Sequence, residues 1–400
     1  YTTVATNGCE NCHKPHTASS PSRLLKTAEQ GTCDGCHTGT TNGGITAKNV
    51  SSATGGPYAK TYRHPTYSVN SKHNPVNASP VTNSPTENSA DVSGANRHAE
   101  CDDCHNPHAA KSGLHTLKSN ALSSVLSGAW GLEPTAVASW TQPTSFTRVD
   151  PATKEYQICM KCHSYYGLGP APTGVTTIIG PSGTNITDQA MEYNINNYSA
   201  HPVKVGSNSQ TGSYAPKALA TNQMTTTWNS VGTQTMYCSD CHGNDQPTSA
   251  TVPQGPHGSN YRYMLTGTAK YWPTNAGGNL WSLNDVRNNL NNWQSNLFCV
   301  NCHPLYSGGQ WRNEVHQKGD HQGSNVYCIT CHVVVPHGSK RSRLIGYATD
   351  PSPYNYNGAG TYAKLVVRGF RKASGPFNYS ENNCTMNSVC HGTQSNTYDP

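Results

Sequence analysis

Charged residues and large apolar side chains are both scarce in this chain of 400 residues. Only 34% of the residues are hydrophobic, with four Phe, which is too little for large cores built from protein alone. Charged residues make up 12%, so the high-charge signature of intrinsic disorder is also absent. Gly, Pro, Ser, Thr and Asn are abundant and favour loops. Metals, disulfides or a bulky prosthetic group must therefore supply the core.

Long apolar runs and clustered charge are missing as well. No stretch approaches the roughly twenty apolar residues of a membrane-spanning helix. The sequence begins at Tyr1 without a charged and then apolar leader, so we expect an export signal to have been removed and the chain to be secreted. The net charge of +6 comes from scattered basic residues, so we expect no nucleic-acid partner.

Sixteen cysteines fall into eight pairs, and His follows the second cysteine of every pair. Seven pairs have the form Cys-x-x-Cys-His, and we number them motifs 1 to 7 along the chain. They are Cys9-Cys12-His13, Cys33-Cys36-His37, Cys101-Cys104-His105, Cys159-Cys162-His163, Cys238-Cys241-His242, Cys299-Cys302-His303 and Cys328-Cys331-His332. Motif 8 has a longer spacing, Cys384-Thr-Met-Asn-Ser-Val-Cys390-His391.

Cys-x-x-Cys-His is the attachment signature of c-type haem. Two thiols one turn apart reach the two vinyl groups of one porphyrin, and the adjacent His becomes the proximal iron ligand. The pattern therefore predicts eight haem c groups, with proximal ligands at the His of each motif, His391 included.

Other uses of paired cysteines explain the pattern less well. Structural zinc and disulfides do not require His after every second Cys, and thioredoxin-like motifs do not occur seven to a chain. For the longer spacing of motif 8, a disulfide beside a free His remains the alternative.

Haem also accounts for the composition, because 400 residues divided among eight haems leaves about 50 residues around each cofactor. We predict a mostly irregular, loop-rich fold with short α-helices and few short strands, cored by an array of haems. Residues 1–400 form one elongated module, loosely divided into 1–150 for haems 1–3, 151–270 for haems 4–5 and 271–400 for haems 6–8. Without haem we expect no stable fold.

Eleven further histidines exceed the eight distal positions that the irons need. The predicted distal ligands are His16, His64, His98, His108, His201, His257, His316 and His337, with His73, His115 and His321 as alternates. The six Met residues show no comparable pattern, although Met ligation is the rival chemistry.

Local sequence supports these choices. His64 and His201 each precede Pro, whereas His257 and His337 each lie in a Pro-His-Gly element. His108 follows His105 by three residues, as His16 follows the His of motif 1. Two axial imidazoles lie on opposite faces of a porphyrin, so a residue this close along the chain cannot easily pass around the ring. We therefore expect each of these two to ligate a neighbouring haem.

The chain resembles the filament-forming outer-surface multihaem cytochromes of metal-reducing bacteria and their archaeal counterparts. The resemblance lies in Cys9-Glu-Asn-Cys-His-Lys-Pro-His16, in Cys101-Asp-Asp-Cys-His-Asn-Pro-His108 and in the Arg-His-Pro element at His64. The resemblance implies a homopolymer in which His16 ligates a haem of the next subunit. Eight motifs rather than six, and the long spacing of motif 8, depart from the six-haem member of that family.

Three functions follow as hypotheses. The first is extracellular electron transfer by a cytochrome filament at the cell surface, with membrane or periplasmic cytochromes upstream and a mineral, an electrode or a cell as acceptor. The second is a soluble periplasmic or surface shuttle, or a component of a membrane-bound porin–cytochrome complex. The third is an octahaem oxidoreductase of the nitrite, hydroxylamine or tetrathionate type, which would need an iron with an open distal position. Because every motif ends in His and histidines are in surplus, we expect an electron carrier without catalytic residues.

Overall fold

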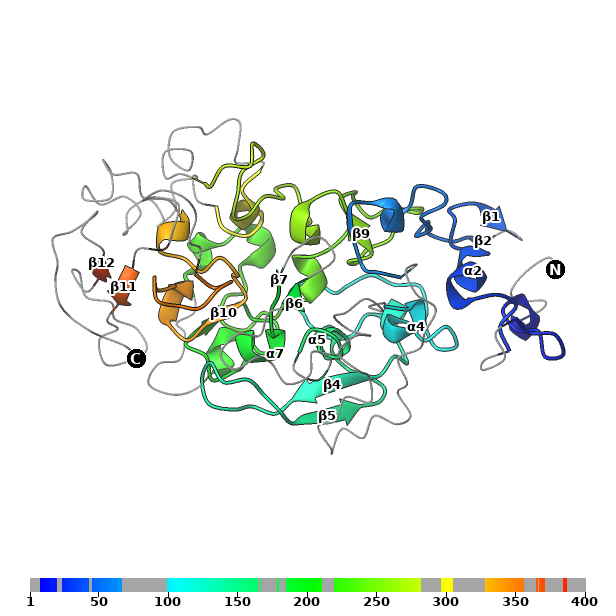
Figure 1. The fold of residues 1–400 in the computed structure, drawn as a ribbon, viewed down its shortest axis with the longest axis horizontal. Helices are drawn as coiled ribbons and strands as arrows, with labels where there is room; N and C mark the ends of the chain where they lie inside the picture. The colour runs from blue at the N-terminus through cyan, green and yellow to red at the C-terminus, as the bar shows by residue number, and fades with distance from the viewer. Residues whose placement is uncertain are drawn as a thin grey trace.

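The fold consists mainly of loops held by many short elements (Figure 1). The computed structural model describes residues 8–19, 24–42, 45–66, 99–164, 166, 178–179, 185–210, 219–281, 296–304, 328–355, 365, 367–370 and 384–386. In Figure 1 the elements follow one another along the long axis, from α2 through α4 and α5 towards β10 and β11. The predicted loop-rich fold class is confirmed.

Within these residues the helices span one or two turns. The α-helices are α2 (Glu29–Asp34), α4 (Cys101–Cys104), α5 (Glu155–Cys159) and α7 (Gln189–Glu192). The 3-10 helices are η1 (Gly8–Asn11), η2 (Pro57–Ala59), η3 (Ser124–Leu126), η4 (Ser207–Ser209), η5 (Thr221–Gln223), η6 (Thr226–Trp228), η7 (Cys238–Asp240), η8 (Arg262–Met264), η9 (Phe298–Asn301), η12 (Cys328–Thr330) and η13 (Ser342–Leu344).

The strands form two-stranded antiparallel sheets. Four sheets join neighbouring segments: β1 (Thr41–Asn42) with β2 (Ile45–Thr46), β4 (Gly131–Pro134) with β5 (Phe146–Val149), β6 (Ile178–Ile179) with β7 (Asn185–Ile186), and β11 (Val367–Phe370) with β12 (Cys384–Met386). Two sheets join distant segments: β3 (Tyr62–Arg63) with β9 (Gly258–Ser259), and β8 (Ser199–Ala200) with β10 (Gly338–Ser339). These last two bring the predicted distal histidines together.

Every described haem motif forms one helical turn. In motifs 1 to 7 the backbone N–H of the His donates to the carbonyl of the first Cys at 2.8–3.0 Å, which is the bond expected between residues four apart in a helix. The turn brings both cysteines and the His of a motif close together in space. This local geometry recurs at each motif, so the surrounding loops differ while the attachment unit stays constant.

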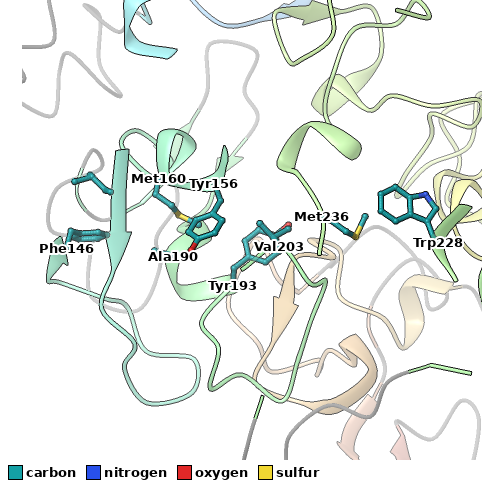
Figure 2. Packing of buried hydrophobic residues seen from close by; sticks show 9 residues of the cluster. Phe146, Tyr156, Met160, Ala190, Tyr193, Val203, Trp228 and Met236 are labelled. Carbon is teal, nitrogen blue, oxygen red and sulfur yellow. The ribbon is translucent and has the colours of Figure 1, made fainter. Parts of the chain in front are cut away.

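Apolar packing is distributed over separate small clusters. The largest contains Leu132, Phe146, Tyr156, Met160, Ala190, Tyr193, Val203, Trp228 and Met236. Figure 2 shows it as an extended row from Phe146 to Trp228. Motif cysteines Cys238, Cys241 and Cys302 pack against it, and a second cluster around Trp281 contacts Cys299 and Cys328. The apolar residues therefore flank the thiols.

Two glycines let strands β9 and β10 pack closely against helices from distant parts of the chain, η2 and α7. A Cβ on Gly258 would collide with the backbone oxygen of Pro57, and a Cβ on Gly338 would collide with that of Glu192. Both glycines directly follow a predicted distal His, so their substitution would displace that imidazole.

We expect Gly258→Ala and Gly338→Ala each to destabilise the haem-loaded protein by about 1–3 kcal/mol, because the added methyl group meets backbone that cannot rotate away. Gly8→Ala is the matched control, since nothing lies within 4 Å of a Cβ at Gly8. Thermal unfolding followed by circular dichroism measures the difference. Equal midpoints for all three variants and the parent chain would contradict the close approach.

Candidate functional site

Imidazole rings from distant parts of the chain face each other in five pairs. Each pair contains one proximal His and one predicted distal His. The centroid separations are 6.0 Å for His13–His108, 6.1 Å for His105–His257, 6.2 Å for His163–His64, 5.9 Å for His242–His337 and 6.5 Å for His303–His201. The ring planes are nearly parallel in the first two pairs and inclined by 47–76° in the others.

These separations fit one metal ion between two imidazoles. A metal–imidazole bond is about 2 Å long and a ring centre lies about 1 Å behind its ligating nitrogen, so axial ligands of one iron have centroids about 6 Å apart. Rings in direct stacking contact would lie closer. The pairs therefore have the spacing that a haem iron requires, and the adjoining thiols have the attachment spacing.

Pairing follows a constant register of two motifs. The His of motifs 1, 3 and 5 face a Pro-His histidine located after the motif two places later. The His of motifs 4 and 6 face a His-Pro histidine located after the motif two places earlier. His108 accordingly faces His13 rather than His105 three residues before it, which is the placement that the porphyrin geometry requires.

Burial keeps five of these imidazoles neutral, as a metal ligand must be. Desolvation lowers the pKa of His257 to about 3 and the pKa of His242 and His303 to about 4. It also lowers the pKa of His105 and His201. Each ring therefore offers an unprotonated nitrogen at neutral pH.

The hydrogen bond at Nδ1 determines that Nε2 is the ring nitrogen available to bind a metal. Nδ1 lies 2.6–3.4 Å from a backbone carbonyl oxygen in His64, His105, His201, His242 and His303. A carbonyl only accepts hydrogen bonds, so Nδ1 carries the proton and Nε2 keeps its lone pair. Such outer contacts orient metal-bound histidines in general.

The surroundings of the motif 6 thiols disfavour the thiolate form. Desolvation raises the pKa of Cys302 to about 12 and that of Cys299 to about 11. Zinc needs deprotonated thiolates, whereas a thioether is neutral and suits an apolar setting. The surroundings of these cysteines therefore fit haem attachment.

Consecutive motifs touch one another. The helix of motif 2 (α2) contacts that of motif 3 (α4), α4 contacts α5 of motif 4, and α5 contacts η7 of motif 5. The Sγ atoms of Cys159 and Cys238 lie within 4.8 Å of each other. Between motifs 3 and 4, the Lys161 ammonium donates to the Asp103 carbonyl. The attachment points of motifs 2 to 5 thus follow one another in chain order.

Two glutamates make the same contact one repeat apart. The carboxylate of Glu29 accepts the N–H of Asp102 at 2.9 Å, and that of Glu155 accepts the N–H of Ser239 at 2.9 Å. Each glutamate lies four residues before the first Cys of an even-numbered motif and holds the residue after the first Cys of the next motif. The spacing Glu-x-x-x-Cys was the sequence signal for this clamp, which sequence reasoning missed.

The distal histidines form two copies of one module. In the first, β3 pairs with β9 and His64 Nδ1 donates to Pro256 O at 2.6 Å. In the second, β8 pairs with β10 and His201 Nδ1 donates to Pro336 O at 2.6 Å. Each module supplies imidazoles to two successive motifs, 3 and 4 in the first and 5 and 6 in the second.

The remaining predicted residues are placed differently. His16 is exposed in the loop after motif 1. His115 is buried with both nitrogens engaged, Nε2 at 3.1 Å from Glu155 and Nδ1 at 2.9 Å from Ser239 Oγ, so this alternate is held by other partners. Outside the described residues lie His73, His98, His316, His321, Cys390 and His391, together with the side chain of Cys384. Ligation at those positions stays a prediction.

A comparison with known families matches residues 2–42 to the doubled CXXCH motif, which spans motifs 1 and 2. No curated protein and no solved structure matches the chain. Among the residues that the structure describes, no helix has the length and apolarity to cross a membrane. The matched motif and its repetition indicate covalently bound haem c, and hence a multihaem c-type cytochrome that transfers electrons.

The imidazole pairs predict different outcomes for two buried histidines. We expect His257→Ala to convert one haem from six-coordinate low-spin to high-spin, because it removes a ring facing His105. His115→Gln should leave the number of low-spin haems unchanged, because His115 faces Glu155 and Ser239 instead. Electron paramagnetic resonance counts the spin states of both variants. A new high-spin signal in the second variant alone would reverse the assignment.

Proposed function

We propose that this protein is an extracellular electron conduit with eight bis-histidine haems, and that it is the repeating subunit of a conductive cytochrome filament. The observation that carries the proposal is the row of five imidazole pairs in a constant two-motif register. Electron transfer slows steeply with distance, so the contacts between consecutive motifs favour exchange along the chain.

Paired imidazoles favour a carrier over an enzyme. A substrate that reacts at haem iron must bind as the sixth ligand, and a histidine on both sides leaves it no position. The five described pairs each contain two imidazoles. The oxidoreductase hypothesis is therefore the weaker one for these haems.

The two-motif register supports a role for His16 between subunits. The Pro-His histidines after motifs 3, 5 and 7 face motifs 1, 3 and 5, so the same element after motif 1 would serve a motif two places before it. In a preceding copy with eight motifs, that is motif 7, with His332 as proximal ligand. An even number of motifs keeps the register unbroken from copy to copy.

The local structure of motif 1 supports the same register. His13, His242 and His332 of motifs 1, 5 and 7 each form an isolated bridge with a Leu or Ile that follows a residue of positive φ. In motifs 5 and 7 this turn directly follows the segment that holds the Pro-His histidine. Motif 1 therefore shares its local structure with motifs 5 and 7, whose Pro-His histidines face the His of another motif. Its own Pro-His histidine, His16, is exposed.

The proposed setting is the cell exterior. Membrane or periplasmic cytochromes would supply electrons, and a mineral, an electrode or another cell would accept them. A soluble shuttle with the same haems is the second candidate, favoured by the exposed terminal loop that carries motif 1. The two differ in their assembly, which an experiment resolves directly.

We expect the secreted parent protein to form filaments in cryo-electron micrographs, with density joining His16 to the motif 7 haem of a neighbour. His16→Ala should give discrete particles and one additional high-spin haem per chain. Lys14→Ala is the matched control, because Lys14 is exposed in the same loop. This variant should still form filaments. Discrete particles from the parent protein would favour the shuttle, whereas filaments from His16→Ala would reject the intersubunit ligand.

A further inference from the structure

One distal imidazole has a carboxylate where others have a backbone carbonyl. Nδ1 of His337 lies 2.6 Å from Oε2 of Glu192, whose side chain is 0% exposed. His201, in the same module, donates instead to the carbonyl of Pro336 at 2.6 Å. The ring of His337 also lies against Tyr193, with centroids 5.2 Å apart.

The local fold holds Glu192 in this place. Glu192 ends α7, and the Asp188 carboxylate caps that helix by accepting the N–H groups of Ala190 and Met191. The backbone oxygen of Glu192 accepts from the Asn197 amide at 2.8 Å and packs against Gly338. The carboxylate is therefore fixed on the imidazole by its own helix and by the strand that carries His337.

The first module provides the internal comparison. Gly258 packs against the backbone oxygen of Pro57 as Gly338 packs against that of Glu192. Tyr58 follows Pro57 and meets His257 edge-on at 5.7 Å, as Tyr193 follows Glu192 and meets His337. Pro57 thus occupies the position of Glu192, but it offers no carboxylate.

His257 consequently lacks the contact that His337 has. Its Nδ1 is buried and has no hydrogen-bond partner among the described residues. The two histidines are equivalent in the repeat, since they face the proximal His of motifs 3 and 5. Their environments differ by one buried carboxyl group.

We propose that Glu192 is a positioning residue that makes the reduction potential at motif 5 more negative than at motif 3. The inference rests on the proposed function, because it requires His337 to be an iron ligand. A carboxylate that accepts a hydrogen bond from Nδ1–H makes Nε2 a stronger electron-pair donor to the iron. Its negative charge in a low-dielectric site also favours the oxidised, more positive iron. Reduction adds one electron and forms or breaks no covalent bond, and the proton stays between His337 and Glu192.

Replacing the charge while keeping its shape tests the proposal. In the haem-loaded Glu192→Gln variant we expect one one-electron component of the spectropotentiometric titration to move to higher potential. A tenfold change in its oxidised-to-reduced ratio at a fixed potential corresponds to about 59 mV. Glu192→Asp should shift the same component less, because the shorter side chain keeps the charge.

A control variant separates this contact from general charge effects. Glu133→Gln removes a carboxylate that pairs with Lys204 and accepts from Tyr156, with no His contact among its hydrogen bonds. Its titration should superimpose on that of the parent protein. Shifts of equal size in Glu133→Gln and Glu192→Gln, or no shift in Glu192→Gln and Glu192→Asp, would overturn the role of Glu192.

The ligand assignment is tested separately. His337→Ala should produce one high-spin haem, detected by electron paramagnetic resonance. If all haems stay low-spin, the pairing of His337 with His242 fails and the proposed site fails with it. If the high-spin signal forms while Glu192→Gln titrates like the parent protein, the site stands and only the inference about Glu192 is wrong.

Discussion

Two imidazoles that face each other across the width of one metal ion hold distant segments of this chain in place. The apolar clusters are small, and the helices and strands are too short to be stable alone. Each pair joins segments far apart in the chain, such as His105 and His257. A covalently held haem between them would cross-link those loops and lower the entropy of the unfolded chain, as metals do in small domains. The loops can therefore lack regular secondary structure and still adopt one conformation.

The two modules share the same backbone framework but differ in one side chain that contacts an imidazole. The glutamate clamps, the two-stranded sheets and the paired distal histidines recur with the same contacts. Within this framework, a single exchange between Pro57 and Glu192 changes the partner of one imidazole nitrogen. The protein thus separates the placement of its cofactors, which the repeated contacts determine, from their electronic adjustment, which side chains that differ between the two modules determine.

The attachment residues of motifs 1 to 7 were predictable because their chemistry lies within five consecutive positions, as in Cys101 to His105. The resemblance between the His64 and His201 elements was also visible, and so was the expectation that His108 reaches a neighbouring haem. Which imidazoles meet could not be read from the sequence, since the partners are distant and every candidate has the same chemistry. Glu192 carried no signal, because a lone glutamate near a Tyr has no distinctive spacing. His115 shows the converse, a histidine whose burial beside Glu155 no local pattern revealed.

The two-motif register also restricts how such a chain can change in length. Inserting or deleting a pair of motifs, together with one Pro-His and one His-Pro element, preserves the register of the five described imidazole pairs. Changing the number by one exchanges odd and even roles beyond the site of change, so that some motifs would face both a Pro-His and a His-Pro histidine and others would face neither. Gene duplication within this architecture is therefore expected to proceed in steps of two motifs, and relatives of different size should differ by even numbers of haems.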